Sequence, residues 1–201
     1  LLKEKMDVLM VHTSHSLGLL KKKLLGDIGK KVDYKFDVRI AIEHDILRYA
    51  DAIVSASPIE PEYIKKLYYV DRDCFFVPPG VDTDFFNPNA RNRAVSLPPR
   101  YIFTTGRKEW TKGFDLLVRA FRHVVRKHDV SLVIGGGSIK PSSVERDIRK
   151  KIDELTEKYG LTGKVIQTGR IPNDILPTYY AKSSIVVLPS RYDLFGMVAI
   201  E

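Results

Sequence analysis

A basic loop at residues 104–113, Thr-Thr-Gly-Arg-Lys-Glu-Trp-Thr-Lys-Gly, holds the residues of this 201-residue sequence that are best suited to chemistry. The loop follows a short apolar run and precedes an amphipathic segment, so we expect Arg107 and Lys112 beside the N-terminus of a helix. Free N–H groups at such a terminus, together with two cations, suit a diphosphate. The loop lacks both the Gly-x-Gly-x-x-Gly and the P-loop spacings, which argues against classical dinucleotide binding and nucleotide hydrolysis. Solvated surface charge is the alternative interpretation.

A glycine cluster, Gly135-Gly136-Gly137-Ser138, follows the next apolar run. Glycine lets the backbone approach a ligand closely because it has no Cβ, and tight turning is the alternative reason for such a cluster. We include Gly136 among the candidate ligand-binding residues.

Two acidic residues, Asp193 and Glu201, lie in the last segment, Pro189 to Glu201. Their separation of eight positions predicts one in a loop and the other about two turns into a helix, where both could face one ligand. Paired carboxylates also occur in glycoside hydrolases, but those acids usually come from separate elements around the bond that is cleaved. Hydrogen bonding to sugar hydroxyls is the simpler role.

A polar loop with one histidine, residues 13–18 (Thr-Ser-His-Ser-Leu-Gly), follows the first apolar run, and Lys21 comes shortly after it. His12 and His15 resemble a metal-binding pair, but His12 falls in the expected strand and no third ligand is apparent, so no metal site is expected. The net charge of +8 suits partners that carry phosphate. A nucleic-acid-binding module is the rival interpretation, but the cations are not interleaved with aromatic residues as in such modules, and no nucleic acid is expected as a partner.

The elements that position these residues alternate between short strands and amphipathic helices, the pattern of parallel strands joined by helical crossovers. Strands are expected near residues 8–12, 52–55, 74–77, 101–105, 131–134, 164–168 and 184–188, and helices near 34–49, 61–67, 113–126, 144–159 and 173–181. Between Val77 and Tyr101 prolines and glycines interrupt the pattern and predict a linker between two α/β units. We place the boundary between residues 88 and 89, and expect a ligand cleft between the units.

The single cysteine, Cys74, is expected to pack in the core of a buried strand, and it fits a reducing cytoplasm. No stretch reaches the roughly 18 apolar residues of a membrane span, so no integral membrane segment is expected. Because the chain begins with leucine and stops at Glu201, we expect a fragment of a protein on the order of 400 residues.

Taken together, these motifs resemble the family 4 glycosyltransferases of the GT-B fold, whose signature is an acidic residue, seven others and then glutamate. Here the signature runs from Asp193 to Glu201, although Asp193 is one methylene shorter than the glutamate usual there. The resemblance covers essentially the whole chain. It also includes Ala50-Asp51-Ala52-Ile53-Val54, Pro78-Pro79-Gly80-Val81-Asp82, Gly106-Arg107, Lys112-Gly113 and Pro189-Ser190.

The resemblance implies a GT-B α/β fold of two Rossmann-like units with parallel sheets, residues 1–88 carrying the acceptor side and residues 89–201 the nucleotide-sugar side. It implies that Arg107 and Lys112 hold the donor diphosphate, that Glu201 binds the ribose, and that Asp193 contacts hydroxyls of the hexose. The remaining residues implied at the donor site are Gly106, Gly136, Phe195, Gly196, Met197 and Val198.

The acceptor loop resembles that of sucrose-phosphate synthases and mannosylfructose-phosphate synthases. That likeness implies contact of His15 with the donor sugar, and binding of the acceptor phosphate by Lys21 and Arg39. Inositol-phosphate glycosyltransferases have a similar loop, so the acceptor stays open, and a sugar-nucleotide binder without catalysis is a further alternative. We therefore expect a retaining hexosyltransferase whose catalytic groups are His15, Arg107, Lys112 and Asp193, with small-molecule substrates and no cofactor.

Overall fold

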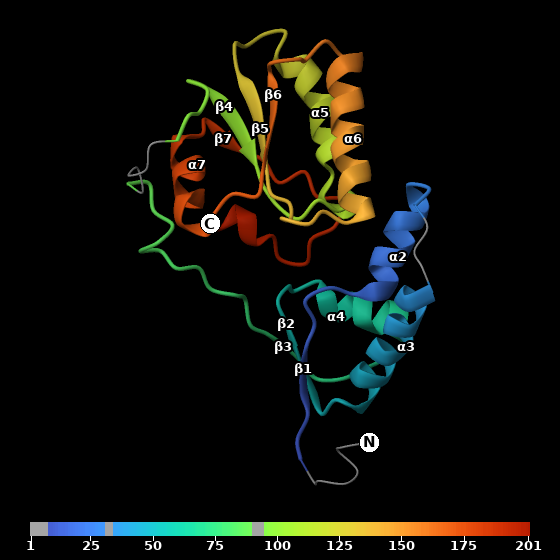
Figure 1. Cartoon of the computed structure of the whole chain (residues 1–201). Coiled ribbons are helices and arrows are strands. Elements are labelled where there is room, and N and C mark those ends of the chain that lie inside the picture. The colour runs from blue at the N-terminus through green and yellow to red at the C-terminus, as the bar shows by residue number, and fades with distance from the viewer. Residues whose placement is uncertain (1–7, 31–33, 90–94) are drawn as a thin grey trace. The chain divides into compact units, whose positions relative to one another are not determined.

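The computed structural model describes residues 8–30, 34–89 and 95–201. By their contacts the residues form two compact units: Leu1–Gly80 with Tyr192–Phe195, and Val81–Arg191 with Gly196–Glu201. Each unit has its own parallel sheet (Figure 1). The division between Gly80 and Val81 falls within the proline-rich segment assigned to a linker. The prediction of an α/β fold with parallel sheets is confirmed.

The first unit has a three-stranded sheet in the order β1-β2-β3, in which all pairs are parallel. Its strands are β1 (Val11–Thr13), β2 (Ala52–Ser55) and β3 (Cys74–Phe76), and its helices are α2 (Gly18–Asp27), α3 (Tyr34–Tyr49) and α4 (Glu60–Tyr63), which continues as the π-helix η1 (Ile64–Tyr68). The core joins Ile53 of the central strand to Leu17, Leu47, Ile64 and Tyr68 from the surrounding loop and helices. This packing fixes the loop after β1 on the helical layer.

In the first unit one expectation is wrong and one helix was not predicted. The segment at residues 74–77 is not a buried strand, because β3 lies at an edge of the described sheet and exposes Phe75 by 56% and Phe76 by 52%. Cys74 is partly buried and does pack against the core cluster. Helix α2 was not expected, because Gly18, Gly26 and three consecutive lysines obscure its apolar pattern.

The second unit has a four-stranded parallel sheet in the order β6-β5-β4-β7. Its strands are β4 (Tyr101–Thr104), β5 (Ser131–Gly135), β6 (Val165–Gly169) and β7 (Ile185–Val186). Its helices are α5 (Phe114–Val124), α6 (Ser143–Lys158) and α7 (Leu176–Lys182), with 3-10 turns η2 (Trp110–Lys112), η3 (Asn173–Ile175) and η4 (Met197–Ala199). Of the expected strand at 184–188, only Ile185 and Val186 form β7, in register with Ile102 and Phe103 of β4.

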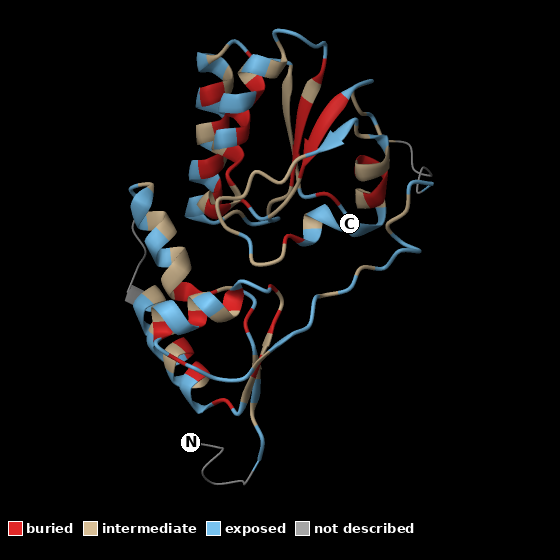
Figure 2. Ribbon diagram, turned by 180° about the vertical axis from the view of Figure 1, so that it is seen from behind, coloured by how far each residue is buried: buried red, intermediate tan, exposed pale blue. Residues whose placement is uncertain are grey.

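Alternating side chains of β4 build two separate cores on the two faces of this sheet. Ile102 packs toward α5 and α6, whereas Tyr101 and Phe103 pack with Tyr179 of α7. Figure 1 shows α5 and α6 on one side of this sheet and α7 on the other. All four residues of β4 are therefore buried, as the central strands in Figure 2 show. A strand covered on both faces is rigid, so the turn that follows it is held in a defined place. Among the described helices, none has the length and apolar character needed to cross a membrane.

Candidate functional site

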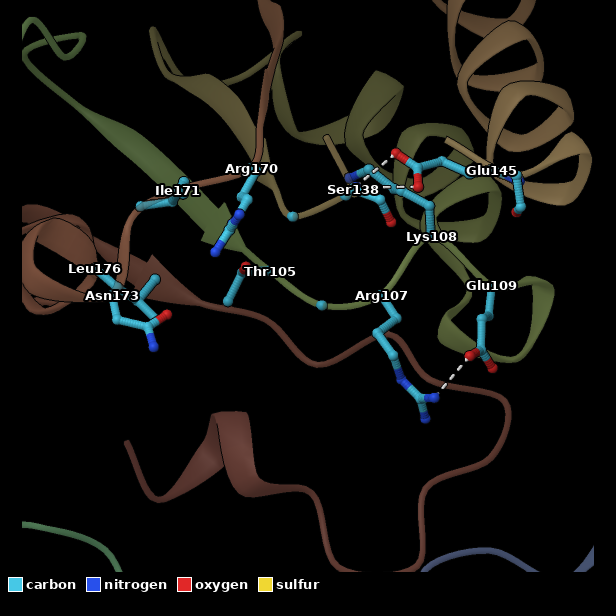
Figure 3. A pocket seen from close by; sticks show the side chains of 14 residues that line it. Thr105, Arg107, Lys108, Glu109, Ser138, Glu145, Arg170, Ile171, Asn173 and Leu176 are labelled. Atoms are coloured by element: carbon cyan, nitrogen blue, oxygen red, sulfur yellow. Dashed lines mark hydrogen bonds and ion pairs between the residues drawn. The ribbon is translucent and has the colours of Figure 1, made fainter. Parts of the chain in front are cut away.

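A pocket of about 370 Å³ lies at the carboxyl ends of β4, β5 and β6 (Figure 3). Ligands of open parallel α/β sheets bind at this edge. The turns after the three strands line it, and the residues that matter below are Gly106, Arg107, Lys108, Gly136, Gly137 and Arg170. The lining holds three cations and two carboxylates, Glu109 and Glu145, and this excess of positive charge favours an anionic ligand. Lys108 and Arg170 were not predicted as site residues.

The glycines at 106 and 136 pack against each other through their backbones. A Cβ on Gly136 would lie 2.0 Å from the carbonyl oxygen of Gly106, and the φ angle of Gly136 is 94°. The amide of Gly136 also donates to the carbonyl of Gly169, 2.8 Å away. Residue 136 must therefore be glycine for the turns after β4 and β5 to meet.

The far end of the β5 turn is held by a buried carboxylate on α6. Both side-chain oxygens of Glu145 lie 3.1 Å from the amide nitrogen of Ser138, and Arg149 donates to Oε1 over 2.7 Å. Burial alone would raise the pKa of Glu145, but these hydrogen bonds and the Arg149 charge bring it below its usual value. Glu145 is thus an ionised anchor, placed by the Ser142 side chain, which accepts from its amide and caps α6.

Of the two predicted diphosphate ligands, Arg107 precedes η2 and Lys112 is its last residue. Arg107 lines the pocket with its side chain 76% exposed, and it forms an ion pair of 3.0 Å with Glu109. Lys112 ends η2, and its Cδ lies 4.0 Å from the position that a Cβ on Gly106 would occupy. Gly113 follows with a φ of 66° and begins α5. Arg107 and Lys112 thus flank the same glycine turn.

A partly buried ion pair ties the Pro189–Arg191 segment to α5. Arg191 donates through both Nη atoms to the two carboxylate oxygens of Asp115, each over 2.8 Å, and also to the carbonyl of Trp110. Burial would raise the pKa of Asp115, but the hydrogen bonds and charge of Arg191 lower it below its usual value. A Cβ on Gly113 would lie 2.1 Å from the carbonyl oxygen of Pro189, so the two segments are in direct contact.

The predicted donor residues after Arg191 are divided between the two units. Asp193 is exposed, Phe195 is partly buried, and both are grouped with the first unit by their contacts. Gly196, buried with a φ of 81°, begins the single turn η4, which contains Met197 and Val198. The expectation that the last acid lies two turns into a helix is wrong, because η4 spans only Met197–Ala199 and Glu201 follows it.

Glu201 lies against α7. Its Oε2 accepts a hydrogen bond of 2.6 Å from the hydroxyl of Tyr180, and both residues line a second pocket of about 210 Å³ with Phe86 and Pro88. One carboxylate oxygen of Glu201 is thus engaged with the protein. This arrangement gives the carboxylate a fixed orientation.

In the first unit, α3 holds the loop that contains His15. Arg39 donates to the carbonyl oxygen of Ser16 over 3.0 Å and to its hydroxyl over 2.7 Å, and lies 3.6 Å from Glu43. His15 is exposed, and Lys21 is partly buried on α2. The structure therefore brings Arg39 to the predicted acceptor loop, where it also supports the loop itself.

The first amides of α2 are capped by side chains from other elements. The Gly18 amide donates to Glu43 over 2.7 Å, and the Leu19 amide donates to the Tyr68 hydroxyl over 2.9 Å. Tyr68 in turn donates to Glu43. These amides are engaged within the protein, so an anion near this loop depends mainly on side-chain cations.

Glu60 is a buried carboxyl group that the sequence analysis missed. It is fully buried, and its Oε2 accepts from the Ser55 hydroxyl over 2.8 Å and from the Ala56 amide over 3.2 Å. Its Oε1 has no hydrogen-bond partner among the described residues. Burial raises the pKa of Glu60 above its usual value, while Ser55, Ala56, Ser14 and His15 oppose this rise. Glu60 thus lies near the His15 loop.

The model of the family "Glycosyl transferases group 1" matches residues 87–201. Over the full length the chain is 28% identical to mannosylfructose-phosphate synthase of Agrobacterium fabrum, covering 47% of that protein. It is 31% identical to the D-inositol 3-phosphate glycosyltransferase of Xylanimonas cellulosilytica, over 98% of this chain and 48% of that one.

The solved structure of sucrose-phosphate synthase from Thermosynechococcus elongatus superposes with a TM-score of 0.82 at 29% identity. The match covers 99% of this chain and 49% of the sucrose-phosphate synthase chain. The chain thus spans about half the length of the relatives it matches. Since the family model covers more than half of the residues, including the whole pocket at the ends of β4, β5 and β6, the chain belongs to the group 1 glycosyl transferases.

Proposed function

We propose that the protein is a retaining glycosyltransferase of family 4 that transfers a hexose from a nucleoside-diphosphate sugar to a phosphorylated sugar. The observation that carries this proposal is the pocket of about 370 Å³, where two glycine turns meet beside Arg107. The pocket lies within the part of the chain that matches the family model. Its size and its cations suit a diphosphate.

Arg107 and Lys112 are proposed to bind the donor diphosphate. The Arg107 side chain is 76% exposed, whereas that of its partner Glu109 is 23% exposed. Because solvent reaches the arginine side of this ion pair and screens it, Arg107 can turn from Glu109 to a phosphate. The glycine turn between the two cations admits the ligand close to the backbone. By resemblance, Asp193 contacts hydroxyls of the hexose, the backbone of Phe195–Val198 lines the donor site, and Glu201 binds the ribose.

In the proposed reaction an acceptor hydroxyl attacks the anomeric carbon on the face from which the diphosphate leaves. The new carbon–oxygen bond forms as the bond to the diphosphate oxygen breaks, and the leaving phosphate takes the hydroxyl proton. Arg107 and Lys112 stabilise the negative charge that develops on the diphosphate, which is electrostatic catalysis. No protein nucleophile and no metal ion is needed in this scheme, because protein cations neutralise the charge.

The acceptor is proposed to be a sugar phosphate, held by Lys21 and Arg39 beside His15. Arg39 supports this proposal because it already contacts the His15 loop through Ser16. An inositol phosphate is the second candidate, because a D-inositol 3-phosphate glycosyltransferase is among the relatives. Assays of the whole protein with fructose 6-phosphate and with inositol 3-phosphate separate the two.

The test of the donor site is the replacement of Arg107 or Lys112 by alanine in the whole protein, with UDP-glucose, GDP-mannose and ADP-glucose as donors. Each lost charged hydrogen bond costs about 1.5–3 kcal/mol, so we expect donor affinity to fall roughly ten- to a hundredfold. Contacts that strengthen in the transition state also lower kcat. The same loss should appear with every acceptor.

The control is Arg126→Ala, which removes an exposed cation just after α5, away from the residues that line the pocket. This variant should keep wild-type donor affinity. Binding of a donor without turnover by the wild type, with either acceptor, would favour the non-catalytic sugar-nucleotide binder. Unchanged affinity and kcat in Arg107→Ala would refute the proposed donor site.

A further inference from the structure

Lys108 is a buried cation directly beneath the glycine turns of the pocket. Its side chain is only 5% exposed, although Arg107 and Glu109 on either side are charged residues of the same loop. Its Nζ donates to the carbonyl oxygen of Gly135 over 2.8 Å and lies 4.1 Å from the centroid of the Phe114 ring. The ammonium group is thus directed into the protein.

Burial of an ammonium group is costly unless its partners compensate. Here the compensation comes from one carbonyl, one aromatic face and the nearby Glu145 carboxylate. Burial and, to a smaller extent, the Arg149 charge together lower the pKa of Lys108 to about 7, against the opposing effect of Glu145. The charged groups around Lys108 are Glu145 and Arg149 on α6, Arg170 after β6, and Arg107 and Glu109 on its own loop.

The hydrogen bond of Lys108 is made at the first residue of the glycine turn. Gly135 ends β5, and Gly136 and Gly137 follow it in left-handed conformations. Glu145 holds the other end of this turn through the Ser138 amide. The turn that packs on Gly106 is therefore clamped at both ends, by Lys108 and by Glu145.

We infer that Lys108 is a positioning residue of the donor site. It holds the Gly135 carbonyl and thereby keeps the 136–137 turn in the shape that receives the diphosphate beside Arg107. Lys108 acts through the turn and does not itself touch the donor. This inference rests on the proposed function, since it deepens the account of the same pocket.

The experiment compares wild type, Lys108→Met and Lys108→Arg in the whole protein, with donor affinity measured for UDP-glucose, GDP-mannose and ADP-glucose. At about pH 6, where the lysine is charged, Lys108→Met should bind the donor roughly tenfold more weakly. Wild-type affinity should fall severalfold between about pH 6 and about pH 8.5, as the ammonium group loses its proton. Arginine stays charged, so Lys108→Arg should not show this fall.

Measurement of folding stability distinguishes a positioning role of Lys108 from a purely structural one. The folded state holds the Lys108 proton less tightly than the unfolded state, so the charged residue opposes folding most at pH values below about 7. Near pH 6 Lys108→Met should therefore be at least as resistant to urea as wild type while it binds the donor more weakly. A purely structural lysine would lose stability and affinity together.

The matched control is Lys140→Met, which removes an exposed lysine from the loop that follows the same turn. An equal loss of affinity in this control would assign the effect to net charge and overturn the inference. Wild-type affinity with an unchanged pH profile in Lys108→Met would overturn it as well, while the proposed function would stand. If none of the three donors bound to wild type, the proposed function would fail and this inference with it.

Discussion

The charged residues of this chain differ in their exposure: some face solvent, and others are buried with partners that the fold provides. Arg107 has a side chain that is 76% exposed, whereas Lys108, Glu145 and Glu60 are 5%, 4% and 0% exposed. An exposed cation can exchange a weak partner for a phosphate. A buried charge keeps its partners, because an unpaired charge inside the protein is unfavourable. Substitutions of Arg107 should change donor binding and turnover but not folding stability, whereas substitutions of the buried residues should also change stability.

Glu60 provides a test of this distinction. Its pKa is raised above the model-peptide value of 4.5, because burial disfavours the carboxylate. The folded state then binds the proton more tightly than the unfolded state, so stability falls as the pH rises from 4.5 through the raised value. Glu60→Gln keeps the shape of the side chain, but glutamine does not titrate. In this variant the free energy of unfolding should therefore not show the decline with rising pH that Glu60 causes in the wild type. Urea unfolding across the acidic to neutral range measures the difference.

The control for Glu60 is Glu62→Gln, two positions away on α4, where the side chain is 64% exposed and pairs with Lys66. Its unfolding free energy should follow the wild-type pH dependence. A Glu60→Gln curve parallel to wild type would contradict the assignment of a buried, proton-binding Glu60.

At the scale of elements, contacts between turns determine the shape of the pocket. The turn after β4 meets the turn after β5 at Gly106 and Gly136, and the Pro189–Arg191 segment is fixed to α5 through Asp115. These contacts join residues that are distant in sequence. The pocket wall therefore depends on strand order and register as much as on the residues within each turn.

Replacement of Gly136 by alanine tests the contact between the turns. The new Cβ would overlap the Gly106 carbonyl, and alanine is strained at a φ of 94°, so we expect a loss of about 2–4 kcal/mol in unfolding free energy. The shifted turn should also raise the donor KM. Urea unfolding and donor kinetics measure the two effects.

Gly160→Ala is the matched control, because Gly160 has a φ of 64° but nothing within 4 Å of its added Cβ. Only the backbone strain remains there, at about 1 kcal/mol, and the donor KM should not change. Equal losses at the two positions would show that the contact with Gly106 adds nothing.

At the scale of the whole molecule, each of the two units has its own sheet and its own core clusters. A substitution on the surface of one unit should therefore leave the fold of the other unchanged. The proposed acceptor residues His15, Lys21 and Arg39 all belong to the first unit, whereas Arg107 and Lys112 belong to the second.

Lys21→Ala is the corresponding prediction. If Lys21 binds the acceptor phosphate, the acceptor KM should rise about tenfold, while donor affinity stays near the wild-type value. Steady-state kinetics with each substrate varied in turn measure both quantities. Lys23→Ala removes an exposed lysine of the same helix and should change neither. Equal weakening of acceptor and donor in Lys21→Ala would count against this role.

The sequence by itself determined the α/β class, the parallel sheets and most element positions. Strand β2 and helix α3 lie at the expected residues, because the period at which apolar residues recur is a local signal that distinguishes strand from helix. Helix α2 was missed, because its glycines and lysines carry a weak apolar pattern and its first amides depend on Glu43 and Tyr68 for their partners. The exposure of Phe75 and Phe76 was also missed, because a sequence does not say which strand lies at a sheet edge.

For the pocket, the sequence predicted Gly106, Arg107 and Gly136, which stand in recognisable motifs at strand ends. Only the tertiary structure revealed Lys108, Glu145 and Arg170 there. Lys108 and Glu145 look like ordinary surface charges in the sequence, but folding buries both. The physical reason is that burial and hydrogen-bond partners arise from residues brought together by strand register and helix packing. The type of a residue limits the chemistry it can perform, whereas its neighbours in the fold decide whether its charge faces solvent, a ligand or the core.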